Sequence, residues 1–319
     1  MPDPDPGPVA PTPAVPDGDE PAASMTEVFT AARARLVGLA YRITGSRIDA
    51  EDLVQEAWLR ARHTDWTTIE RPEAWLTTVV SRLALDHLRS AAHRRETYVG
   101  PWLPEPVLSE SLDLAPAAAP DPAAVTELSE SLTFGFLRLL ETLSPVERVV
   151  FLLAEVFQTP YDDIAAVVDR SPENCRQIAT RARRHVQAGR PRHDTGGDAA
   201  RVVRGLLVAV GQGDIEQAVA LLADDAVLVS DGGAATHAAR RPVEGADKVA
   251  RFLVNLARRY WMVRSELVEI NGEPGMVSWL DDKVFWAVSA EVRDGVVSSI
   301  HTIRNPDKLA ALDITTPML

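Results

Sequence analysis

The chain has 319 residues, of which 46% are hydrophobic and 25% charged, with a formal net charge of −13 and one cysteine. This length suggests two or three domains, and the composition excludes collagen, a coiled coil, a wholly disordered chain, an internal disulfide and a cysteine-based zinc site. No apolar run reaches the roughly 18 residues of a membrane span and no secretory signal precedes the first domain, so we expect a cytoplasmic protein.

The acidic residues and prolines are concentrated in two segments. Residues 1–24 contain five acids and no base, and residues 97–126 contain four acids and no base. The same segments hold fourteen of the 23 prolines. Because this composition buries little apolar surface, we expect a disordered tail over 1–24 and a linker over 97–126. The remaining segments keep clustered bases, which leaves nucleic-acid binding open.

The segment between tail and linker, residues 25–96, is predicted to be all helical. Apolar residues recur at helical spacing over 26–44, and Gly45 follows as a C-terminal cap. A second helix follows Ser46, with an apolar stripe on one side and acidic and amide side chains on the other. Pro72 begins a third helix, which ends in a basic cluster.

The segment after the linker, residues 127–190, has the spacing of a helix-turn-helix. Ser144-Pro145-Val146-Glu147 is a capping box that begins one helix. A short helix near 160–168, a brief turn and a longer basic helix after Ser171 follow. Such a basic helix fits the major groove, where arginine reads guanine and glutamine reads adenine, although a solvated basic helix is the alternative. The side chains expected on its DNA-facing side are Arg176, Gln177, Thr180, Arg181 and Arg184.

Residues 197–319, after a looser break around 189–197, are predicted to form an α+β domain with one curved antiparallel sheet. Two helices precede a strand near 226–230, a third helix follows, and four strand-like runs are joined by hairpin-type turns such as Asn271-Gly272. Its aromatic, acidic and histidine residues could line a pocket or act as acid and base. Nothing in their spacing indicates this, and we favour an aromatic core with turn aspartates. These candidates are Asp231, His237, Tyr260, Trp261, Trp279, Asp281, Phe285, Trp286 and His301.

Three stretches of the helical segments resemble a known family. Leu36–Ala61, "LVGLAYRITGSRIDAEDLVQEAWLRA", resembles the core-binding and first promoter-binding helices of extracytoplasmic-function (ECF) sigma factors. Arg71–Arg95 looks like the next helix of that family, and Leu143–Val186 is similar to its −35-binding domain. The resemblance implies that 25–96 binds core RNA polymerase and the −10 element, and that 127–190 binds the −35 element.

The resemblance also implies roles for particular side chains. The exposed side of the second helix would meet the β′ clamp helices of the polymerase, whose β subunit is a further expected contact; its residues are Asp52, Leu53, Gln55 and Glu56. The −10 element would be met by Asp65, Trp66, Asp86, Arg89 and Arg94, although Trp66 could equally be a core residue. The −35 element would be met by Arg176, Arg181 and Arg184.

Three further motifs resemble the SigJ-like group of ECF sigma factors, which carry a fused SnoaL-like domain of the NTF2-like fold. They are "YVGPWLPEP" at 98–106, "VSDGG" at 229–233 and "NPDKL" at 305–309. In that group the glycine motif continues with a glycine and a lysine, where this chain has Ala234 and Ala235. We predict that the segments at 98–106 and 305–309 help to fix the relative position of the two DNA-binding domains. The alternative is that the 305–309 segment merely caps its own sheet. The regulatory candidates are Trp102, Leu103, Pro104, Asp231, Gly232, Gly233, Asn305, Pro306, Asp307, Lys308 and Leu309.

We therefore expect two all-α domains followed by an α+β NTF2-like domain, in an alternative sigma factor regulated in cis by the third domain. No catalytic residue, metal or cofactor is expected. The partners would be core RNA polymerase and promoter DNA, with a small-molecule ligand of the third domain left open and no membrane contact. The alternative is a DNA-binding regulator whose third domain senses a small molecule or is an enzyme. We also expect Asp307 and Lys308 to be surface residues, whose replacement changes stability by less than about 1 kcal/mol.

Overall fold

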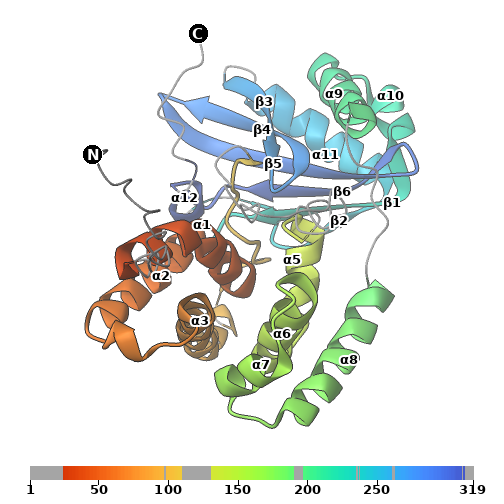
Figure 1. The fold of residues 1–319 in the computed structure, drawn as a ribbon. Coiled ribbons are helices and arrows are strands. Elements are labelled where there is room, and N and C mark those ends of the chain that lie inside the picture. Colours follow the sequence, from red (N-terminus) through yellow and green to blue (C-terminus); the bar gives the residue numbers. More distant parts are fainter. Residues whose placement is uncertain are drawn as a thin grey trace, which may run out of the picture.

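The computed structural model shows three packed parts (Figure 1). No helix in the described part of the chain is long and apolar enough to cross a membrane. The expected tail lies outside the described residues except for Ser24, and so does the later part of the expected linker. The structure describes residues 24–96, 98–109, 131–189, 197–234, 236, 238–260, 263–310 and 312, with the side chains of 91–96 and 197 excepted.

The first part is the predicted helical domain. Ser24 and Glu27 form a capping box at its start, and Gly45 ends the first helix with φ 72°. Alanine and leucine side chains on the facing sides of three helices make a common core, which confirms the helices expected from periodicity. The elements are α1 (Met25–Thr44), α2 (Arg47–Arg62), the 3-10 turn η1 (Trp66–Thr68) and α3 (Pro72–Glu96).

The second part contains the expected helix-turn-helix. Ser144 and Glu147 form the predicted capping box. Asp169, with φ 54°, makes the left-handed turn between the last two helices. The elements are α5 (Phe134–Leu140), α6 (Pro145–Phe151), a π-helical turn η3 (Leu152–Val156), α7 (Tyr161–Val168) and α8 (Pro172–Gly189).

The third part is an α+β domain with six strands in the order β2-β1-β6-β5-β4-β3. Its strands are β1 (Leu222–Asp231), β2 (Val243–Glu244), β3 (Arg264–Ile270), β4 (Glu273–Leu280), β5 (Lys283–Arg293) and β6 (Val296–Ile303). Its helices are α9 (Gly197–Gln212), α10 (Ile215–Ala220), α11 (Ala246–Arg259) and α12 (Pro306–Leu309). The predicted α+β class is confirmed.

The expectation of an antiparallel sheet is correct for all pairs except one. β3 to β6 form an antiparallel meander, whose turns have positive φ at both central residues, as Asn271 and Gly272 show with 56° and 78°. β1, however, pairs with β6 in parallel. After β1 the chain runs through α11 to β3 at the opposite edge of the sheet. Short turns join only antiparallel neighbours, so they do not predict the direction in which β1 pairs with β6.

The two faces of this sheet have different partners. Helices α9, α10 and α11 pack on one face (Figure 1). The opposite face packs on Leu103 of the expected linker and on Phe134 of α5, both fully buried. Residues 98–109, which we call the strap, are therefore a packed segment rather than a loose linker, because their apolar side chains and prolines fit between the first and third parts.

The two helical parts also touch each other directly. The Arg71 guanidinium donates to both carboxylate oxygens of Asp163 at 3.0 and 2.7 Å. Arg82 donates to the carbonyl of Ala166, and the buried Arg148 donates to the carbonyl of Ile43 at 2.9 Å. α3 therefore lies against the first helix of the helix-turn-helix.

Candidate functional site

The exposed side of α2 is acidic, as predicted. Alanines and Val54 fill the apolar stripe that faces α1 and α3. This packing leaves Asp52, Gln55 and Glu56 exposed, while Leu53 is half-buried against the core. Glu56 pairs with Arg60 at 3.1 Å on the same helix. The surface therefore presents exposed carboxylates, which suit a basic protein surface better than DNA.

The residues predicted for the −10 element lie in two places, the turn η1 and the helix α3. Asp65 caps the turn η1, where Oδ1 accepts from the N–H and the hydroxyl of Thr67 at 3.2 and 2.7 Å. Trp66 is half-buried and packs edge-to-face on Trp75, with ring centroids 6.0 Å apart. The structure thus brings Asp65 and Trp66 into one short turn, with Trp66 contributing partly to the core.

The other −10 candidates lie on α3. Asp86 and Arg89 are exposed and form an ion pair of 3.2 Å. Arg94 lies in the last turns of the helix, outside the residues whose side chains are described. Asp86 and Arg89 therefore share one exposed stretch of α3.

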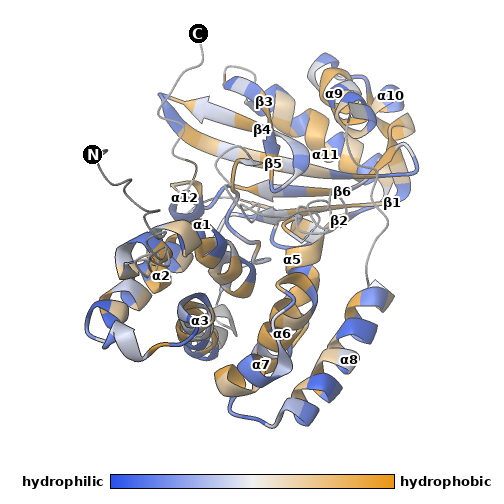
Figure 2. Ribbon diagram, in the orientation of Figure 1, coloured by the Kyte–Doolittle hydropathy of each residue, from blue (hydrophilic) through white to orange (hydrophobic). Residues whose placement is uncertain are grey.

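The predicted DNA-facing side of α8 is exposed as a set. Cys175, Ile178 and Val186 are buried on the opposite side of the helix. The five predicted side chains, Arg176, Gln177, Thr180, Arg181 and Arg184, are all exposed. In Figure 2 much of the α8 ribbon has the colour of hydrophilic residues. The arrangement supplies cations and hydrogen-bond donors along one helix face, which is what major-groove recognition needs.

Two arginines of α8 already have protein partners. Arg176 lies over the Tyr161 ring, 5.2 Å from its centroid. Arg183 donates to both carboxylate oxygens of Glu155 at 2.7 and 2.5 Å. Arg183 therefore attaches α8 to η3, a packing role that the count of basic residues alone does not reveal.

The three motifs of the predicted regulatory set meet at the buried carboxylate of Asp231. Its Oδ1 accepts from the Tyr98 hydroxyl at 2.5 Å and from the Gly233 N–H at 3.1 Å. Its Oδ2 accepts from the Leu103 N–H at 2.8 Å and from Lys308 Nζ at 2.7 Å. One side chain at the end of β1 thus holds both the strap and α12.

Lys308 is buried, so its expected surface position is wrong, whereas Asp307 is exposed as expected. Lys308 Nζ also donates to the Leu103 carbonyl and lies 4.1 Å from the centroid of the Trp102 ring. Nearby, Asn305 donates to the Tyr98 hydroxyl at 2.8 Å. The ammonium is therefore enclosed by a carboxylate, a carbonyl and an aromatic face, which offsets the cost of burying it.

The strap also holds the corner between α1 and α2. Trp102 packs so closely on Gly45 that a β-carbon there would overlap the indole ring. The Glu105 carboxylate accepts from the backbone N–H groups of Arg47 and Ile48 at 2.7 and 3.2 Å, which caps α2. Burial raises the pKa of Glu105 although these hydrogen bonds oppose the shift.

A second joint centres on Asn271, which the sequence indicates only as a turn residue. Its buried Nδ2 donates to the Tyr41 hydroxyl at 2.7 Å and to the Leu132 carbonyl at 2.9 Å. Its Oδ1 accepts from the Val107 N–H at 3.0 Å, and Tyr41 donates to the Glu105 carbonyl at 2.7 Å. The turn between β3 and β4 therefore touches all the other parts of the molecule. An Asn-Gly pair marks the turn but carries no signal of these distant partners.

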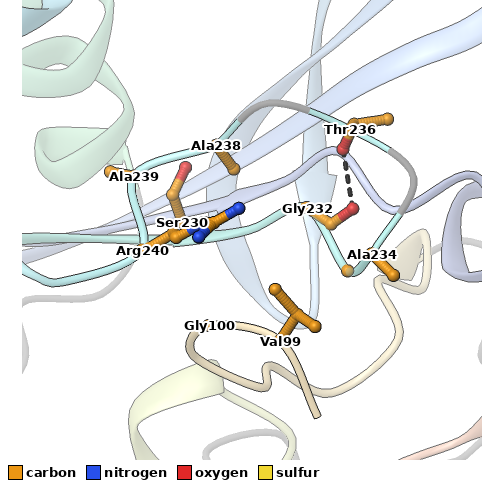
Figure 3. A pocket seen from close by; sticks show the side chains of 10 residues that line it. Val99, Gly100, Ser230, Gly232, Ala234, Thr236, Ala238, Ala239 and Arg240 are labelled. Carbon is orange, nitrogen blue, oxygen red and sulfur yellow. Dashed lines mark hydrogen bonds between the residues drawn. The ribbon is translucent and has the colours of Figure 1, made fainter.

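A cavity of about 140 Å³ lies between the strap and the loop after β1 (Figure 3). Two hydroxyls that line it already have protein partners: Thr236 donates to the Gly232 carbonyl at 2.7 Å, and Ser230 pairs with Thr302. Arg240 is the charged residue among the described lining, with Val99 and several small residues. This lining gives no catalytic constellation.

The predicted pocket-wall residues do not form one wall. Trp279 and His301 face the strap side of the sheet, where His301 stacks on Phe134. Tyr260 and Trp286, with Phe285, gather around Arg304 in the helix-covered cluster. His237 and Trp261 lie outside the described residues.

The comparisons with known proteins identify both helical domains. Residues 28–94 match the family model for sigma-70 region 2, and residues 134–186 match the model for sigma-70 region 4. The two helical domains are therefore of the sigma-70 region 2 and region 4 types.

The relatives define the family more closely. The chain is 43% identical, over 88% of its length and 91% of the relative, to the ECF RNA polymerase sigma factor SigJ of Mycobacterium tuberculosis H37Rv. It is 31% identical, over 90% of its length and 96% of the relative, to a probable ECF RNA polymerase sigma factor SigI of the same species. The crystal structure of Mycobacterium tuberculosis SigJ is similar with a TM-score of 0.69 and 36% identity, covering 90% of this chain and 99% of that one. The chain belongs to the ECF RNA polymerase sigma factor family, which confirms the resemblance found in its sequence.

Proposed function

We propose that the chain is an alternative sigma factor of the cytoplasm that binds core RNA polymerase, recognises −10 and −35 elements and starts transcription. Region 2 would extend over 25–96 and region 4 over 127–190, with 197–319 regulating both in cis. The acidic face of α2, the segment from η1 to the end of α3, and the basic face of α8 supply the three contact surfaces. Among the side chains proposed for these surfaces, those that the structure describes are exposed, apart from the half-buried Leu53 and Trp66.

The observation that carries the regulatory part is the Asp231 contact. It attaches the strap to the third domain, and the strap in turn caps α2 of the first domain. α5 of the second domain packs on the same sheet face. The third domain therefore touches both DNA-binding domains at once and biases their separation. Because duplex DNA advances 3.4 Å per base pair, a small change in that separation changes which promoter spacing fits.

Run-off transcription with purified core RNA polymerase tests the proposal. A promoter-specific transcript that depends on this chain supports a sigma factor. A DNA-binding regulator would instead bind the promoter fragment in the absence of core enzyme and give no such transcript. That second outcome would contradict the proposal and favour the alternative stated from the sequence.

Charge reversal on α2 should weaken binding to core enzyme. For Asp52→Lys with Glu56→Lys we expect a loss of roughly tenfold or more, since like charges would then face a basic partner. Both side chains are exposed, so thermal stability should change by less than about 0.5 kcal/mol. The measurement is fluorescence anisotropy of labelled chain titrated with core enzyme. Glu266→Lys with Glu269→Lys on the exposed edge strand is the matched control, and equal losses in both pairs would refute the assignment of this face.

A further inference from the structure

Three ionisable side chains lie together in the core beneath α5. Glu273 of β4, Glu291 of β5 and His301 of β6 are 5%, 3% and 1% exposed. One oxygen or ring nitrogen from each lies within 4.8 Å of the others. Two carboxylates rarely share a buried site, because burial penalises each charge and the charges repel. The groups packed around these three side chains therefore determine whether the carboxyl groups carry charge.

Helix α5 forms the lid of this cluster. The Phe134 ring stacks on His301, with centroids 5.4 Å apart and planes inclined at 28°. A β-carbon at Gly135 would overlap Glu291 Oε1, so only glycine allows the helix to approach this closely. The Thr133 hydroxyl caps the helix by accepting from the Phe136 N–H at 3.3 Å. The first turn of α5 thus fits directly on the carboxylates.

The contact of Arg138 with His301 indicates where the imidazole proton lies. Arg138 Nη1 is 3.5 Å from His301 Nε2. A guanidinium can only donate, so Nε2 accepts and the ring proton is on Nδ1. Nδ1 faces Glu291 Oε1 at 3.8 Å. A protonated Nδ1 has no lone pair for a cation, so this geometry favours a cluster that holds protons over one that holds a metal.

The charges around the carboxylates give the direction of their titration. Burial, followed by the charge of Glu291, raises the pKa of Glu273 well above its usual value, while the Ser289 hydroxyl, which donates to Oε2 at 2.8 Å, opposes this. The Phe134 N–H at the start of α5 also opposes the shift of Glu273. Burial raises the pKa of Glu291 to about 7. The shift is opposed first by Arg138 of α5, then by the Gly135 N–H of the same helix, and more weakly by Ser299 and Arg293. With His301, which borders both carboxylates, these groups surround the pair.

We propose that this cluster is a proton-controlled contact between region 4 and the third domain. While the carboxylates hold their protons, α5 stays seated on the sheet. When the protons leave to solvent, two negative charges share one buried site, and α5 is released together with the helix-turn-helix. The effect of this release on promoter spacing rests on the proposed function, whereas the pH-dependent packing of α5 on the sheet does not.

The sign follows from the direction of the pKa shifts. The docked carboxylate of Glu291 has a pKa of about 7, against 4.5 for an exposed one. The docked state therefore holds more protons, and its advantage is complete below pH 4.5 and is lost as the pH rises towards 7. For this one group the opening equilibrium should increase roughly tenfold between pH 6 and pH 8. Loss of the proton from Glu273 would increase this change further.

Hydrogen–deuterium exchange of the full chain, without polymerase or DNA, tests the proposal. After correction for the chemical exchange rate, protection of residues 131–140 should fall roughly tenfold from pH 6 to pH 8. In Glu291→Gln, which mimics the protonated acid, it should stay high at both values. Glu269→Gln, an exposed acid of the adjacent strand β3, should follow the parent chain.

Three results would overturn the proposal. The first is equal protection of residues 131–140 at both pH values in the parent chain. The second is a fall in protection in Glu291→Gln as large as in the parent, and the third is an equal fall in the core of α3, which would indicate a general loss of stability. Glu273→Gln provides a second variant: it should also reduce the fall, and the proposal fails if it does not. Because the measurement contains no polymerase, failure of the proposed function would leave its result unaffected.

Discussion

Replacing Lys308 by alanine should destabilise the folded protein by about 3–5 kcal/mol, because the buried Asp231 carboxylate would lose its counter-charge. The ammonium lies 2.7 Å from Asp231 Oδ2 and also donates to the Leu103 carbonyl. Thermal unfolding monitored by circular dichroism measures the loss. At equal folded concentration, promoter-directed transcription should change as well, because the strap loses the contact between the Leu103 carbonyl and Lys308, one of its attachments to the third domain.

The adjacent Asp307→Ala is the control for Lys308→Ala. Its side chain is exposed, so we expect a change of less than about 0.5 kcal/mol. Adding Asp231→Asn to Lys308→Ala should recover part of the loss, since no unpaired charge then remains buried. A loss below about 1 kcal/mol for Lys308→Ala alone would show that the ion pair does not anchor the strap.

Arg181→Ala and Arg184→Ala should each weaken binding to −35 DNA by about 1–3 kcal/mol where the arginine reads a base. Such a loss would be confined to the matching sequence, whereas loss of a phosphate contact would weaken binding to every duplex alike. Fluorescence anisotropy with matched and scrambled −35 duplexes at one fixed salt concentration separates the two cases. Arg176→Ala should have a similar effect and also remove the contact with Tyr161.

Arg183→Ala is the matched control on the same helix. Its guanidinium is bound to Glu155, so its removal should affect DNA affinity less than the loss of Arg181 or Arg184. If all four variants lose the same affinity, the DNA-facing side of α8 has been assigned wrongly. If Arg183→Ala alone loses affinity, the helix enters the groove in another rotation.

The helices, turns and fold class could be predicted because their signals are local. The Ser144 capping box and the Asn-Gly turn each depend on a few adjacent residues. The pairing of β1 with β6 could not be predicted, because it joins segments some 70 residues apart that carry no complementary pattern. Hydrophobic spacing identifies a strand but does not select its neighbour.

The same limit applies to the candidate site. The three motifs were predicted only to be regulatory, and the structure adds that they meet at Asp231. The burial of Lys308 was missed, since a lysine in a short polar motif after the last strand is usually exposed. Asn271 was missed as a joint because its partners, Tyr41, Val107 and Leu132, come from segments more than 100 residues away.

The apolar cluster that joins Leu103 and Phe134 to the sheet affects how modular this chain is. The region 2 and region 4 matches end well before the third domain, which suggests parts that could be separated. Yet both side chains are completely covered, by neighbours such as Val229 and Ile303. A chain cut after residue 196 would expose them as a new apolar patch and invite aggregation. Truncation would thus remove half of a shared core, and its first effect would be on solubility.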